Sequence, residues 1–169
     1  MITLDYAKTM AAYNRWQNKS LYGAAAGLSE EERRRERGAF FGSIHKTLSH
    51  LRWGDEVWLS RFSDFPPPPP ITSLRGSADV YDDWDALCAG RAALDETIIE
   101  WAEALTPRDL AGDLTWHSST MQRDITRPRA LLIAHMFNHQ THHRGQVHAM
   151  LTAAGAKPDD TDLPFMTRD

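Results

Sequence analysis

Apolar residues recur at helical spacing in four long stretches of the chain, separated by proline, glycine and capping residues. A Ser-x-x-Glu box that begins at Ser29 predicts a short helical turn after the first stretch. A chain of 169 residues can bury a hydrophobic core as one domain, so we expect a single all-α domain over residues 1–169. The predicted helices cover about residues 4–28, 43–64, 79–105 and 128–155.

Two segments depart from this helical pattern. Five consecutive prolines, Pro66–Pro70, predict an extended and rigid crossing of about 15 Å, because proline favours the polyproline conformation. Between residues 113 and 126 the pattern changes to short alternation around Leu114 and Trp116. This alternation predicts a hairpin or an extended excursion before the last helix.

Charge and composition exclude several classes of function. The formal net charge is -4, and the basic stretch Arg33–Arg37 is interleaved with glutamates, which argues against a nucleic-acid partner. The aliphatic run Ala130–Ala134 is too short to span a membrane, and Met1–Asp5 does not look like the start of a signal peptide. Cys88 is the only cysteine, so an internal disulfide cannot form. We therefore expect a soluble, cytoplasmic protein with no membrane partner.

The chemistry is concentrated between Ala134 and Met150, where five of the eight histidines lie. Residues four apart on a helix share a face, so His139 and His143 can direct two imidazoles at one metal ion. His135 and His139 have the same spacing, and His142 lies to the side. Spacing alone leaves both pairs open.

A third ligand would have to come from another helix, and His50 is the best candidate because it lies in the middle of an otherwise apolar helix. Its neighbours on that face include Gly54 and Val57, which leave room for a partner helix. His45 is closer to the helix start, where we expect a solvated or capping residue. Helical bundles commonly hold metals between facing helices. On spacing alone, hydrogen-bonded structural histidines are an equally good interpretation.

Four segments carry a family resemblance. They cover the chain from near its start to near its end, and together they resemble the DinB/YfiT-like family of damage-inducible proteins. The segments are YNRWQNKSLY at residues 13–22, LSHLRWGDEVWL at 48–59, NHQTHHRGQV at 138–147 and LTAAGAKPDDTDLPF from residue 151.

The resemblance selects one set of metal ligands. The family pattern has one histidine in the second helix and an H-x-x-x-H pair directly before R-G-Q, which map onto His50, His139 and His143. The other histidines of the last helix are set aside. The resemblance further implies an up-and-down four-helix bundle, a homodimer, and one divalent ion with an incomplete coordination sphere. Three imidazoles suit zinc, nickel or iron, and they do not select one of these metals.

The resemblance also suggests a reaction class. Some relatives transfer or rearrange thiol adducts, so we expect a metal-dependent enzyme such as a thiol S-transferase, acting on a small-molecule thiol and an electrophilic substrate, or else a hydrolase. The alternative is a non-catalytic metal-binding protein with a stress-related or structural role. An open cleft above the metal would favour catalysis, and a fully enclosed ion would favour structure.

Several side chains have expected supporting roles. Asp55, Asn138 and Gln146 are candidates to orient ligands or substrate, although Asp55 could equally be an exposed helix residue. Arg91 interrupts an apolar stripe, and we expect its stem to lie on apolar surface with the guanidinium at the edge, where it could anchor an acidic ligand. Cys88 occupies an apolar position of the third helix and is a poor candidate for the nucleophile.

Overall fold

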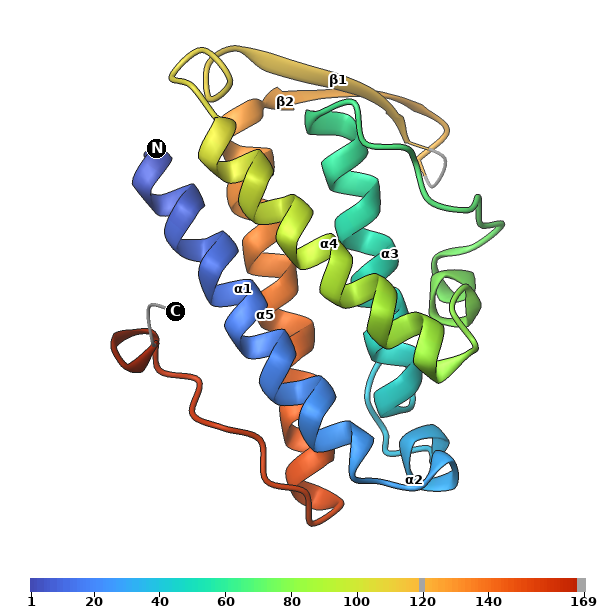
Figure 1. The fold of residues 1–169 in the computed structure, drawn as a ribbon. Coiled ribbons are helices and arrows are strands. Elements are labelled where there is room, and N and C mark those ends of the chain that lie inside the picture. The colour runs from blue at the N-terminus through green and yellow to red at the C-terminus, as the bar shows by residue number, and fades with distance from the viewer. Residues whose placement is uncertain (119–120, 167–169) are drawn as a thin grey trace.

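A computed structural model describes residues 1–118 and 121–166, and helices make up most of it (Figure 1). A small antiparallel hairpin precedes the last helix, which confirms the predicted helical class and the predicted excursion. No helix of the described ranges is both long and apolar enough to cross a membrane. The α-helices are α1 (Leu4–Ala26), α2 (Glu30–Arg34), α3 (Ile44–Phe62), α4 (Trp84–Ala104) and α5 (Arg129–Ala153); the 3-10 helices are η1 (Leu74–Asp79) and η2 (Leu163–Phe165); the strands are β1 (Asp113–Ser118) and β2 (Arg123–Pro128).

The ends of the long helices follow the capping residues of the sequence. Ser43 and Asp83 each accept a hydrogen bond from a backbone amide of the first turn of α3 and α4. Because Asp83 caps α4, that helix begins later than the predicted residue 79, and the segment before it forms η1 instead. The last helix stops at Gly155, whose φ of 81° suits glycine.

The long helices do not simply alternate in direction. Helices α1 and α5 run one way, whereas α3 and α4 both run the other way (Figure 1). This differs from the predicted up-and-down order, because the connection over residues 63–83 returns along α3 before α4 begins. The proline run lies in this connection, where the indole Nε1 of Trp53 donates to the carbonyl oxygen of Pro69 at 3.0 Å.

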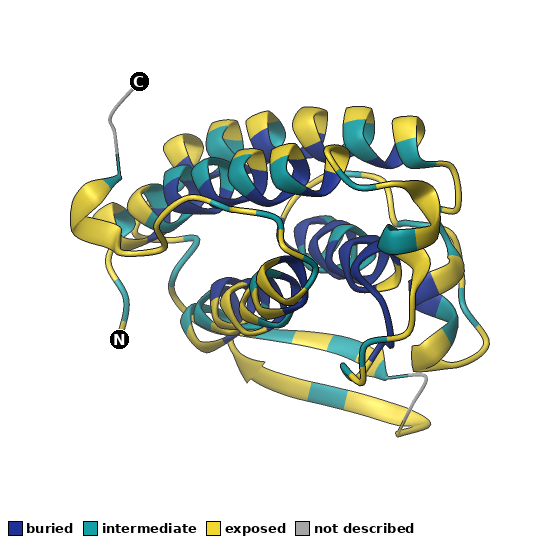
Figure 2. Cartoon of the chain, turned by 90° about the horizontal axis from the view of Figure 1, so that it is seen from below, coloured by how far each residue is buried: buried dark blue, intermediate teal, exposed yellow. Residues whose placement is uncertain are grey.

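Apolar side chains form two clusters at opposite ends of the helices, and buried residues lie on the facing sides of the helices (Figure 2). One cluster includes Ala11, Leu59, Ile98 and Phe137. The other includes Leu21, Leu48, Leu87 and Val147. Each cluster takes residues from α1, α3, α4 and α5, which is the burial pattern expected of packed amphipathic helices.

Between the two clusters lies a buried set of charged and amide side chains, here called the polar layer. Arg91 of α4 lies between two carboxylates, with Nη1 2.6 Å from Asp55 Oδ2 and Nη2 2.8 Å from Asp95 Oδ1. The amide of Gln140 on α5 donates to Asp55 at 2.9 Å. The full layer is Asn14, Asn18, Asp55, Arg91, Asp95, Gln140 and Arg144.

The remaining members connect α1 to the same network. Asn14 and Asn18 donate to Asp95 Oδ1 at 3.1 and 2.9 Å, and Arg144 of α5 donates to Asn14 Oδ1. Burial raises the pKa of Asp55 and of Asp95 above the ordinary value, and Arg91 acts against that rise. Burial by itself favours the neutral acids, and Arg91 and the amide donors are the groups that favour the charged carboxylates.

The position of Arg91 corrects the prediction from the sequence. The residue is only 2% exposed, so its guanidinium lies inside the protein rather than at the edge of an apolar surface. Asp55 is likewise buried and is not an exposed helix residue. Both side chains can be buried because each supplies the opposite charge that the other needs in a low-dielectric interior. The guanidinium of Arg91 is therefore not available to anchor an acidic ligand.

His45 is the second correction. It is 2% exposed, and its ring Nε2 donates to the carbonyl oxygen of Tyr81 at 2.9 Å, so it is neither solvated nor a cap. Burial lowers its pKa. The contact joins the start of α3 to the end of the returning connection.

Replacing Arg91 by methionine should strongly destabilise the fold. Asp55 and Asp95 would remain buried without their cation, and breaking one side of a buried ion pair costs about 3–5 kcal/mol. Urea unfolding followed by circular dichroism would measure the loss. Arg15→Met is the matched control, because it removes a partly exposed pair with Glu96 between α1 and α4 and should cost less than about 1 kcal/mol. Equal stability of the Arg91 and Arg15 variants would contradict the proposed importance of the layer.

Candidate metal centre

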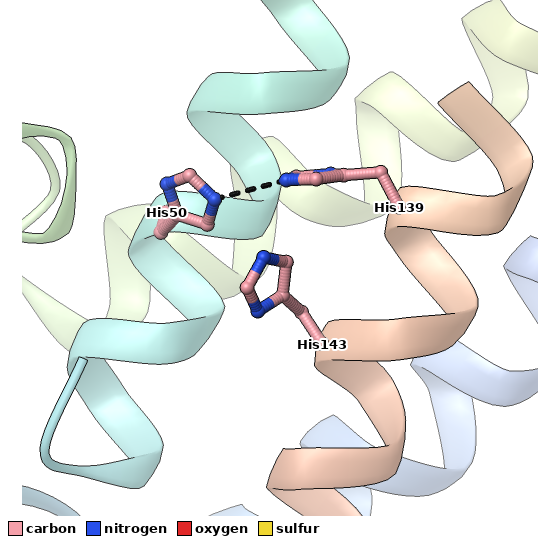
Figure 3. Close-up of side chains that lie close together, drawn as sticks. All are labelled: His50, His139 and His143. Atoms are coloured by element: carbon pink, nitrogen blue, oxygen red, sulfur yellow. Dashed lines mark hydrogen bonds between the residues drawn. The ribbon is translucent and has the colours of Figure 1, made fainter. Parts of the chain in front are cut away.

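Three histidine side chains from two helices meet beside the polar layer (Figure 3). His50 extends from α3, and His139 and His143 extend across from α5. One ring nitrogen from each lies within 4.8 Å of the corresponding atoms of the other two, and the Nε2 atoms of His50 and His139 are 3.0 Å apart. The structure therefore brings together the three residues that the sequence analysis selected.

The alternative pair, His135 with His139, does not form a second cluster of this kind. His135 lies one turn before His139, but its ring packs edge-on against Trp58 at 5.1 Å between centroids. His142 is exposed. Neither joins the group of residues, within the described ranges, that could share one ion.

Gly54 makes the close approach of the two helices possible. It lies one turn after His50 on α3, and a Cβ atom at this position would be 3.0 Å from His139 Cε1. That separation is shorter than ordinary van der Waals contact. The expectation that Gly54 leaves room for a partner helix is confirmed.

The tautomer of His50 follows from a chain of hydrogen bonds. The hydroxyl of Ser77 donates to the carbonyl oxygen of Leu74 at 2.5 Å, so its oxygen is left to accept from His50 Nδ1, which is 2.7 Å away. With the proton on Nδ1, the lone pair of His50 lies on Nε2, the atom that faces His139. Ser77 belongs to η1, and no local sequence signal connected it to a histidine on α3.

His143 is oriented in the same way from its own helix. Its Nδ1 lies 2.8 Å from Gln146 Oε1, an amide oxygen that can only accept, so the proton is on Nδ1 and Nε2 carries the lone pair. Hydrogen bonds of this kind ordinarily fix the orientation of metal-binding histidines. His139 differs, since its buried Nδ1 has no hydrogen-bond partner within the described residues.

Burial keeps these rings neutral. The pKa of His50 and of His139 is lowered to about 3, with burial as the largest cause and the neighbouring imidazoles as the remaining contribution. Burial also lowers the pKa of His143. At neutral pH the rings are uncharged, which is the protonation state that binds a metal. The ring of Phe41 stacks on His50 at 3.9 Å between centroids and covers one of its faces.

The geometry fits a single ion. Nitrogens that are about 2.0–2.1 Å from one ion in tetrahedral geometry lie roughly 3–3.5 Å from each other, close to the His50–His139 separation. Three neutral imidazoles suit zinc, nickel or iron, and they do not select one of these metals. Since no carboxylate or cysteine joins the described group, an ion held here would keep a coordination position without a protein ligand.

The three histidines line a cavity of about 840 Å³. Its walls come from α3 and α5, from the segment before α3, from the middle of the returning connection and from the hairpin. Its volume lies within the range of small-molecule sites. The lining residues are Phe40, Phe41, His50, Trp53, Gly54, Val57, Trp58, Arg61, Ile71, Thr72, Ser73, Leu74, Trp116, Ser118, Gln122, His135, His139 and His143.

The other residues that the sequence suggested are placed differently. Gln146 touches His143, as its predicted orienting role requires, whereas Asp55 serves the polar layer and Asn138 is exposed outside the cavity lining. Cys88 is half-buried rather than buried, and burial raises the pKa of its thiol. It does not line the cavity, so the structure places no cysteine of this chain beside the histidines.

Two known proteins are similar to this chain over most of its length. Protein DinB of Bacillus subtilis (strain 168) is 25% identical over 173 residues, covering 97% of this chain and 96% of the relative. A solved DinB-like protein from Bacillus cereus ATCC 10987 has a TM-score of 0.54 and 21% identity over 86% of this chain and 90% of that chain, a likeness that concerns the fold.

The sequence pattern of the DinB family matches residues 1–168, a range that covers nearly the whole chain and contains the three histidines of the cluster. The chain therefore belongs to the DinB family.

Proposed function

We propose that this protein binds one divalent metal ion through His50, His139 and His143, and that it is a metal-dependent enzyme such as a thiol S-transferase. The observation that carries the proposal is that the histidine cluster lines an open cavity instead of being enclosed. Structural ions are usually surrounded by four protein ligands, whereas catalytic ions keep a position for water or substrate. This contrast favours catalysis over a purely structural role of the ion.

Each protein group has a defined task in this proposal. The three imidazoles hold the ion, while Ser77 and Gln146 keep the lone pairs of two of them directed at it. A bound divalent ion would supply Lewis acidity, which stabilises a coordinating thiol as its thiolate. The indoles of Trp53 and Trp58 line the cavity and limit the access of water to an electrophilic substrate bound there.

The fold supports the same assignment. We interpret the packing of α1, α3, α4 and α5 as the four-helix bundle of the family, with α3 and α4 parallel. In such bundles metal sites are built from side chains on facing helices, as His50 and the pair on α5 are here. The homodimer implied by the family resemblance stays a prediction.

Removing a ligand should abolish stoichiometric metal binding. His139→Ala or His143→Ala removes one of three imidazole ligands, and we expect the bound metal to fall from one ion per chain to a small fraction. Elemental analysis of protein purified without a metal column would measure it. His142→Ala and His135→Ala are the matched controls on the same helix and should retain the ion. Full retention of metal by a His139→Ala/His143→Ala double variant would refute the site.

Gly54→Ala should separate metal binding from folding. The new Cβ would displace the His139 ring, and we expect metal affinity to fall roughly tenfold or more, the scale of losing an orienting contact. The fold should be unchanged or stabilised, by up to about 1 kcal/mol, because alanine favours a helix over glycine.

Gly23→Ala on α1 is the control, because an added Cβ there meets nothing within 4 Å. Isothermal titration with zinc and thermal unfolding would compare the two variants. The same zinc affinity in Gly54→Ala and Gly23→Ala would show that the close approach of Gly54 to His139 does not matter for the ion.

The catalytic part of the proposal predicts thiol consumption. Metal-loaded protein mixed with a chromogenic aryl halide and with cysteine, glutathione or coenzyme A should form the thioether faster than the His50→Ala variant does. Absorbance of the released product would follow the reaction. If no thiol reacts faster than in that variant while the wild type still holds its metal, the non-catalytic alternative is correct.

A further inference from the structure

The cavity has a second polar end, formed by Arg61. His50, Gly54, Val57 and Arg61 follow one another at helical spacing along α3, and all four line the cavity. Arg61 lies eleven positions after His50, which corresponds to about 16 Å between their Cα atoms along the helix axis. The guanidinium lies over the ring of Trp58, which is one turn nearer to His50 along α3.

Two indole rings hold this guanidinium in place. Its central carbon lies 4.5 Å from the ring centroid of Trp58 and 5.3 Å from that of Trp116, which comes from the hairpin. Contacts with aromatic faces stabilise a guanidinium without using the N–H groups at its edge. The donors of Arg61 thus stay available, in a position shaped by two separate elements of the fold.

Arg61 has no acidic partner within the described residues. Other arginines of α3 and α4 that are similarly or more deeply buried are paired, Arg52 with Glu56 and Arg91 with Asp55 and Asp95. Burial is the one cause that shifts the pKa of Arg61, which it lowers, and no carboxylate acts against it. The guanidinium nevertheless stays charged at neutral pH, because the ordinary pKa of arginine lies far above neutrality.

The charges that line the cavity favour an anionic ligand. The chain carries 23 acidic residues and a net charge of -4, yet no aspartate or glutamate is among the described residues that line the cavity. The titratable lining groups are Arg61 and the four histidines His50, His135, His139 and His143. An ion held by three neutral imidazoles would add positive charge at the opposite end, since those ligands neutralise none of it.

We propose that Arg61 binds the anionic group of the substrate, and that the substrate is a small organic anion with an apolar or aromatic body. A carboxylate can accept two parallel hydrogen bonds from one guanidinium, which gives orientation as well as affinity. The apolar walls at Val57, Ile71 and Trp116 suit the body of such a molecule. This assignment rests on the proposed function for the reacting end of the substrate, which would lie at the histidine cluster.

The test uses 2-naphthoate and its neutral isostere 2-naphthamide as probes of the full-length protein, with zinc bound and with metal removed. Fluorescence titration should give tighter binding of 2-naphthoate in both states. Arg61→Met keeps the apolar stem and removes the charge, so it should weaken 2-naphthoate binding about tenfold or more and leave 2-naphthamide binding unchanged. Arg61→Lys should retain part of the preference, because it keeps the charge without the planar fork.

Arg108→Met, which removes an exposed arginine outside the cavity lining, should behave as the wild type. Zinc stoichiometry of Arg61→Met should stay at one ion per chain, so loss of the anion site is distinguishable from loss of the metal site. Equal affinity of the wild type for both probes, no binding of 2-naphthoate by the wild type, or unaltered 2-naphthoate binding by Arg61→Met would each overturn the assignment. A preference for 2-naphthoate that survives in metal-free protein supports it even if the metal proposal fails.

Discussion

The buried ion pair between Arg91 and Asp55 is the interaction on which the rest of the structure depends. Together with Asp95 and the amides around it, this pair contacts α1, α3, α4 and α5 at one level and separates two apolar clusters. Hydrophobic packing alone tolerates sliding of helices, whereas a charge that is satisfied only in one register does not. The layer therefore fixes how far each helix can move along its neighbours.

The position of the three-histidine cluster depends on that register. Asp55 directly follows Gly54, and Gln140, which binds Asp55, directly follows His139. The same pair of helices thus presents a hydrogen bond on its inner side and the histidine cluster towards the cavity. Three imidazoles can converge on one ion only if α3 and α5 are held to within a fraction of an ångström, and the polar layer supplies that constraint without contributing a ligand.

Local sequence patterns predicted the helices and part of the histidine cluster. They did not predict features that depend on contacts between residues distant in sequence. Helical periodicity gave the long helices, and a four-residue spacing together with the family resemblance gave His139 and His143. The burial of Arg91 and His45 could not be predicted, because it depends on partners distant in sequence, carboxylates in one case and a carbonyl in the other. The contact of Ser77 with His50 has the same origin.

The returning connection over residues 63–83 has a consequence for how this fold can vary. It supplies cavity wall at Ile71 and Leu74, and it also carries Ser77, which sets the tautomer of His50. Trp53 ties its proline run to α3, so the segment is stiff although it lies outside the long helices. Substitutions in this one segment can therefore alter both the wall of the cavity and the orientation of the His50 ring.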